Sequence, residues 1–206
     1  MLRAISALAR YSADLVYPNA CLVCDSPERE TAPVRHGLCS DCRRAVGTDP
    51  HPTCPRCAHT VGPHADTADG CPGCRGERLA FDRAVRLGPY TGKLRAAILR
   101  MKMPAGEGLA DRMGRAFAES RAPALAAEGV GLVVPVPLHW WRRFRRGFNQ
   151  SAALARELAD ALRVPFAPHL LRRSGWSVQH AQPTRAARRA NVAGAFRVRP
   201  GARLAQ

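Results

Sequence analysis

The sequence predicts an α/β protein in two parts, a cysteine-rich amino-terminal module followed by a domain built on a parallel sheet. All eight cysteines fall between positions 21 and 74, as four C-x-x-C pairs. Residues 129–137 form a short, almost wholly apolar run, typical of a strand buried on both faces, and a helical pattern follows. We expect three segments: an amino-terminal helix over 1–18, the cysteine module over 19–78 and the sheet domain over 79–206.

The first segment has the pattern of an amphipathic helix. Leu2, Ile5 and Leu8 fall near one side, while Arg10 and Asp14 interrupt the apolar character that a signal peptide needs. We favour packing against the core over a peripheral membrane contact. No apolar run approaches the roughly eighteen residues of a membrane span, so none is expected.

The C-x-x-C pairs are spaced like the knuckles of zinc ribbons. Fourteen residues separate the first two pairs, thirteen the last two, and eleven the second from the third. Two knuckles complete a tetrahedral Cys₄ site with no open position, so we predict two structural zinc ions in tandem ribbons. The expected ligands are Cys21, Cys24, Cys39, Cys42, Cys54, Cys57, Cys71 and Cys74. Spacing leaves open a cross-braced alternative, in which the first and third knuckles share an ion.

Two other uses of eight cysteines fit less well. A disulfide-rich extracellular module would need a secretion signal, and a thioredoxin-like motif normally occurs once beside a strand-helix unit. The two cysteine units are instead an internal duplication. Gly37 and Gly70 precede the second knuckle of each unit, where a chain reversal favours glycine.

The second part shows alternating and helical patterns in turn. Residues 81–87 alternate apolar and charged side chains like a half-buried strand. Residues 94–101 predict a helix that Pro104 ends, and residues 109–117 predict another. A further helix carries a stripe of leucines before Pro165 stops it; the candidate caps are Asn149 and Ser151 and the stripe is Leu154, Leu158 and Leu162.

The loop over residues 138–148 is the candidate ligand site, because ligands of open α/β sheets bind beyond the carboxyl ends of strands. It holds four arginines with interleaved aromatic residues and no acid. The net charge is +16 and thirty of the 32 basic side chains are arginine, which favours bidentate phosphate contacts, although genomic base composition could give the same bias. The alternatives are a solvated charge run and, for Asn149, a helix cap. We predict phosphate or nucleic-acid binding by Arg142, Arg143, Arg145, Arg146, Asn149 and Gln150.

Residues 134–139 (VPVPLH) and 145–150 (RRGFNQ) resemble the ComF family of competence-associated proteins. The match continues through Tyr90-Thr91-Gly92, Lys102, Gln179, Arg188, Arg189, Asn191-Val192 and Ala195-Phe196. The resemblance implies a type I phosphoribosyltransferase-like domain, with Pro135 to His139 near pyrophosphate and residues 179–196 covering the site. It adds Arg188 and Arg189 to the predicted binding residues.

The resemblance further implies a cytoplasmic protein that handles incoming single-stranded DNA with a helicase partner. Magnesium is expected only with a phosphoribosyl ligand. After residues 201–204 a family member would continue into a buried strand and an acidic ribose-phosphate loop, so we expect an incomplete domain. An incomplete sheet edge favours oligomers. We assign no catalytic residue, and the alternative function is a non-catalytic zinc-ribbon adaptor that binds nucleic acid or docks a protein.

Overall fold

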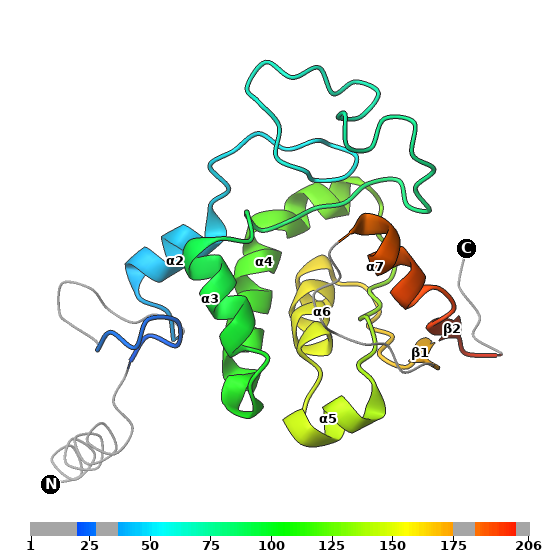
Figure 1. Ribbon diagram of the computed structural model, residues 1–206. Helices are drawn as coiled ribbons and strands as arrows, with labels where there is room; N and C mark the ends of the chain where they lie inside the picture. The colour runs from blue at the N-terminus through cyan, green and yellow to red at the C-terminus, as the bar shows by residue number, and fades with distance from the viewer. Residues whose placement is uncertain (1–19, 28–36, 175–183, 201–206) are drawn as a thin grey trace, which may run out of the picture. The chain divides into compact units, whose positions relative to one another are not determined.

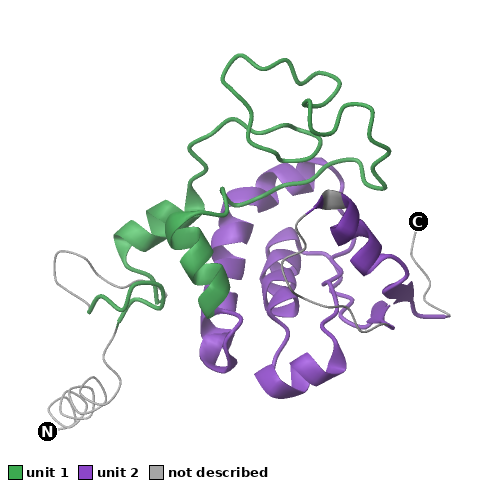
Figure 2. Cartoon of the chain, in the orientation of Figure 1, with its two compact units in different colours: residues 1–100 green, residues 101–206 purple. Residues whose placement is uncertain are grey.

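The computed structural model in Figure 1 describes residues 20–27, 37–174 and 184–200. The predicted helix over residues 1–18 lies outside the described residues, as do Gln179 and residues 201–204. The chain divides into two compact units, residues 1–100 and 101–206 (Figure 2). The segment boundaries at residues 18 and 78 stay predictions. No helix among the described residues is long and apolar enough to cross a membrane.

The first unit contains the two cysteine segments, and their first knuckles repeat the same backbone turn. Antiparallel bridges join Ala20 to Pro27 and Thr53 to Thr60, at equivalent positions of the two segments. The residue after each of these knuckles is left-handed, with φ of 57° at Asp25 and 56° at the equivalent alanine. The repeated geometry supports the predicted internal duplication.

Helices α2 (Ser40–Gly47) and α3 (Gly92–Arg100) complete the first unit. The buried residues are Cys42 and Val46 on α2 and Leu94 and Ala97 on α3. The end of α3 is tied to the first knuckle, because both terminal nitrogens of Arg100 donate to the Asp25 carboxylate at 2.7 Å. The helix predicted over 94–101 is thus confirmed.

The strand predicted over residues 81–87 is wrong. The structure gives these residues no regular strand, and Phe81 is 47% exposed. Ala84 donates a backbone hydrogen bond of 2.9 Å to Arg56 O. Alternating residues form a strand only when a neighbouring strand accepts and donates their backbone hydrogen bonds, and the described residues provide no such neighbour here.

In the second unit, a short 3₁₀ turn (η1, Pro104–Gly106) leads into the long helix α4 (Glu107–Ala127), which packs on α6 (Gln150–Leu162). The helices approach closely at Gly114, where a Cβ atom would lie 3.0 Å from Leu154 Cα. Asn149 caps α6 by accepting a hydrogen bond from the Ser151 amide at 3.1 Å. Both predicted helices and the predicted cap are confirmed.

The sheet of the second unit differs from the prediction. Strands β1 (Leu171–Arg173) and β2 (Phe196–Val198) pair antiparallel, with α7 (Arg185–Val192) between them in sequence. The apolar run over 129–137 forms only an isolated parallel bridge, from Val133 to Phe166. Two prolines in that run lack the N–H groups that would extend a ladder. The described residues therefore form a mixed helix-strand unit, and the parallel sheet stays a prediction.

Candidate zinc centres and arginine-rich helix

The structure gathers the cysteines into two groups of four in sequence order. One group holds Cys21, Cys24, Cys39 and Cys42, and the other holds Cys54, Cys57, Cys71 and Cys74. Within each group all four sulfur atoms lie within 4.8 Å of one another. This grouping matches the tandem arrangement and not the cross-braced alternative.

The sulfur spacing suits zinc. A tetrahedral site with Zn–S bonds of about 2.3 Å places its sulfurs about 3.8 Å apart. The Sγ atoms of Cys24 and Cys39 are 3.8 Å apart, as are those of Cys54 and Cys74, while Cys57 and Cys71 are separated by 3.6 Å. The two Cys₄ groups therefore fit two structural zinc ions.

In the first group, hydrogen bonding and burial give the thiols different pKa values. Cys24 Sγ lies 3.2 Å from Ser26 Oγ, and hydrogen bonding with the side chain of Ser26, followed by that with its backbone, lowers the pKa of Cys24 to about 6. Burial, followed by hydrogen bonds with the neighbouring cysteines, raises the pKa of Cys42 above its ordinary value. A bound divalent cation would instead stabilise the thiolate form of all four sulfurs.

In the second group, hydrogen bonding and burial also give the thiols different pKa values. Burial opposes the ionisation of Cys54, but backbone amides of Cys57, Arg56 and Cys71 outweigh it and lower the pKa of Cys54 to about 6. Burial raises the pKa of Cys57 to about 12 and also raises that of Cys74. These sulfurs lie too close together to ionise as a set without a cation to offset their charge.

Glycine is required at the turn into the last knuckle. Gly70 has φ of +91°, and a Cβ atom there would lie 2.7 Å from Cys74 Sγ. Gly37 has φ of 74° at the corresponding turn of the first ribbon. Both observations agree with the predicted need for glycine before the second knuckle of each unit.

Most of the basic segment over residues 138–148 forms helix α5 (Trp140–Arg146), so its prediction as a loop is wrong. His139 caps its amino end, accepting a hydrogen bond from the Trp141 amide, and Gly147 ends it with φ of 85°. A glycine often follows the last residue of a helix, so Gly147 was the sequence signal for the end of α5.

Three of the predicted arginines line one cavity. Its volume is about 460 Å³, and its walls come from α5 and from the turn before α4. The lining residues are Lys102, Met103, Pro104, Trp141, Arg142, Arg145 and Arg146. No acidic residue belongs to this lining, so every charged side chain in the cavity wall is basic.

The cavity arginines strengthen the local positive potential. Burial, and next the charge of Arg173, lower the pKa of Arg142. Burial, and next the charge of Arg142, lower the pKa of Arg146, whose Nη1 donates to Gln150 Oε1. An anion in the cavity would relieve this repulsion. The strand residue Arg173 and Lys102 were not predicted as site residues, since their proximity depends on the tertiary fold.

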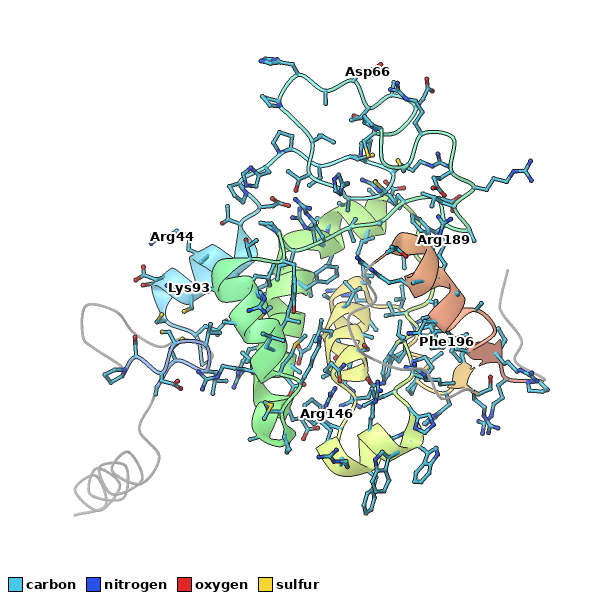
Figure 3. The ribbon with its side chains drawn as sticks, viewed as in Figure 1. Arg44, Asp66, Lys93, Arg146, Arg189 and Phe196 are labelled. Carbon is cyan, nitrogen blue, oxygen red and sulfur yellow. The ribbon has the colours of Figure 1, made fainter. Side chains whose placement is uncertain are left out.

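The other predicted residues lie elsewhere. Arg143 and Asn149 line a separate cavity of about 290 Å³ that also contains Glu107 and Asp111. Asn149 Nδ2 donates to Val136 O at 3.1 Å in addition to capping α6, which supports the structural alternative for this residue. Arg188 and Arg189 are exposed on α7, a helix that lies away from α5 in Figure 1. Figure 3 labels Arg189 on α7 and Arg146 on α5. Their participation in one binding site stays a prediction.

Comparison with known proteins agrees with the cysteine pattern. Residues 12–75 match the family described as the double zinc ribbon domain. Competence protein F of Haemophilus influenzae is 27% identical over 169 residues, which cover 79% of this chain and 70% of the relative. No solved structure matches.

The relatives called DNA utilization protein YhgH extend the match. The Salmonella typhimurium protein is 30% identical over 188 residues, covering 89% of this chain and 79% of the relative. The Escherichia coli K12 protein is 29% identical with the same coverage. Together with the paired Cys₄ groups, these matches show that the chain belongs to the ComF family and carries its double zinc ribbon.

Proposed function

We propose that this protein binds single-stranded DNA during DNA uptake or utilization, holding backbone phosphates in the basic cavity beside α5. The observation that carries this proposal is the cavity wall of Arg142, Arg145, Arg146 and Lys102, with no carboxylate among its lining residues. Guanidinium groups bind phosphate oxygens bidentately, and a polyanion would offset their mutual repulsion. The names of the relatives, competence protein F and DNA utilization protein YhgH, support the biological setting.

Within this proposal the eight cysteines bind zinc and hold the ribbons in shape, leaving DNA contact to the arginines. The ComF resemblance suggests a helicase as the partner that supplies the single-stranded DNA. It also suggests that binding takes place in the cytoplasm. The net charge of +16 supports attraction to DNA over longer distances. This binding role is compatible with both functions considered for the protein, a phosphoribosyltransferase-fold protein and a non-catalytic adaptor.

A phosphoribosyltransferase-like arrangement of residues 79–206 is part of the proposal. Its support is the isolated parallel bridge between Val133 and Phe166, because α6 lies between these two residues in sequence, as a helix does in a β-α-β connection. Val133 packs with Ala155 and Ala159 of that helix, as a crossover helix packs on its sheet. Magnesium would enter only with a phosphoribosyl ligand.

The test is the salt dependence of single-stranded DNA binding. Replacing Arg142, Arg145 and Arg146 together with alanine should weaken binding and flatten the slope of log affinity against log salt. The expected change in slope is about 0.7 per lost phosphate contact, or about 2 for three contacts. Fluorescence anisotropy at several salt concentrations measures both quantities.

A matched control has the same loss of charge elsewhere. Arg43, Arg78 and Arg172 are exposed and lie outside the cavity lining. Replacing these three arginines with alanine should leave the slope of log affinity against log salt close to that of the unchanged protein. Lysine at the three cavity positions should restore most of the slope, because it restores the charges. Equal slopes for the cavity and control variants would refute the cavity as the phosphate site.

A further inference from the structure

We propose that the aromatic face of α5 is a base-stacking platform that makes the site select single strands over duplexes. The platform comprises Trp140, Trp141 and Phe144. This inference rests on the proposed DNA-binding function and deepens it, because it assigns the bases to one face of the helix and the phosphates to another.

The platform side chains are exposed in a way that packing does not explain. Trp140 is 71% exposed, Phe144 is 77% exposed and Trp141 is 41% exposed. Helix α5 contributes no buried residue to the core of its unit. Large aromatic rings gathered on a protein surface mark a binding site.

Helical geometry separates the rings from the charges. At about 100° per residue, the platform side chains occupy an arc of about 100° on α5. The four arginines fill the remaining circumference, so an extended strand could contact both kinds of side chain along one helix. The arginines are Arg142, Arg143, Arg145 and Arg146.

The ring geometry offers flat surfaces to a base. Trp141 and Phe144 are stacked, with centroids 5.9 Å apart and an interplanar angle of 20°. Trp140 meets Trp141 edge-on, at 5.7 Å and 74°. Because Phe144 has a highly exposed side chain, an unpaired base could extend the stack beyond it.

Trp141 joins the platform to the phosphate site, since it also lines the basic cavity with Arg142 and Arg145. A single strand alternates phosphates and free bases over short distances, which matches cations in a cavity beside exposed rings. In a duplex the bases are paired and stacked inside the helix, so they cannot reach the rings. An anionic membrane also attracts arginine and tryptophan, but its flat surface does not fit cations placed in a concavity.

The test uses the full zinc-loaded chain with Trp140 and Phe144 both replaced by alanine. The probes are an oligothymidine of about 20 nucleotides, a duplex of equal length and vesicles containing phosphatidylserine. We expect the variant to bind the single strand about tenfold or more weakly, with duplex binding and the salt slope nearly unchanged. Tyrosine at both positions should restore single-strand affinity, because it restores the stacking surfaces.

Phe81→Ala is the matched control, because Phe81 is an exposed aromatic residue of the other compact unit. Its single-strand affinity should equal that of the unchanged protein. Equal affinity of the platform variant, equal losses for single strand and duplex, or a loss confined to vesicle binding would overturn the platform. If the arginine variant loses binding but the platform variant does not, the proposed function stands alone; absence of any single-strand binding overturns both.

Discussion

Replacing Cys74 with serine is expected to reduce the zinc content from two ions per molecule to one and to unfold the second ribbon. The buried cluster of this ribbon consists of Cys54, Cys71 and Cys74, and the larger apolar neighbours packed against it among the described residues are Val61 and Leu79. So small a core cannot offset the entropy of ordering the chain, and structural zinc supplies on the order of 10 kcal/mol at such sites. Elemental analysis of the purified variant measures the loss directly.

The second unit provides an internal control for the loss of zinc. Helices α4 and α6 both lie in that unit, so far-ultraviolet circular dichroism should retain a cooperative unfolding transition when one ribbon is lost. Two zinc ions in the Cys74→Ser variant, or disulfides in place of zinc thiolates after reducing purification, would contradict the assignment of the ligands.

Gly70→Ala is expected to weaken the same zinc site without removing a ligand. The new Cβ would lie 2.7 Å from Cys74 Sγ, so the sulfur would have to leave its position. Gly76→Ala is the matched control, because Gly76 also has positive φ, +77°, but a Cβ there meets nothing within 4 Å. A competing chelator should extract one zinc ion from Gly70→Ala first; equal zinc retention by both variants would contradict the steric argument.

Gly114→Leu is expected to destabilise the second unit by about 1–3 kcal/mol, the usual cost of overpacking a filled interface. A Cβ at Gly114 would lie 3.0 Å from Leu154 Cα and 3.1 Å from Glu157 Cβ, so α4 and α6 would have to separate. The largest packed interface between described elements, that between α4 and α6, would be disturbed. Denaturant unfolding followed by far-ultraviolet circular dichroism measures the free energy of unfolding.

Gly108→Leu, on the same helix, separates packing from helix propensity. A Cβ at Gly108 meets nothing within 4 Å, and leucine is a better helix former than glycine by up to about 1 kcal/mol. This control should be neutral or stabilising. A similar loss of stability in both variants would show that close packing at Gly114 is not the cause.

The cysteine sites could be predicted from sequence because their determinants are local. Each C-x-x-C pair places two sulfurs in one turn, and a short connection brings the second pair back. Helices α3, α4 and α6 were predictable for a related reason, since their apolar residues recur with the helical period. The Asn149 cap likewise depends only on the amide two residues later.

Strands were harder to predict, because a strand exists only through its partners. The alternating residues 81–87 lack a neighbouring strand in the described structure, whereas the antiparallel pair β1 and β2 joins segments that are far apart in sequence. The parallel bridge at Val133 depends on a partner beyond α6. Periodicity reports the exposure of a segment but does not identify the segment that pairs with it.

The sequence by itself determined the two groups of cysteines that fit zinc, the family and the presence of an arginine-rich, aromatic segment. The structure showed that this segment is a helix, and the tertiary packing decided that three of its arginines share a cavity with Lys102. It also separated Arg188 and Arg189, on α7, from the lining of that cavity. The physical reason is the distance along the sequence between the residues that form each feature. Metal knuckles and caps form within a few residues, while a cavity wall depends on how distant segments pack.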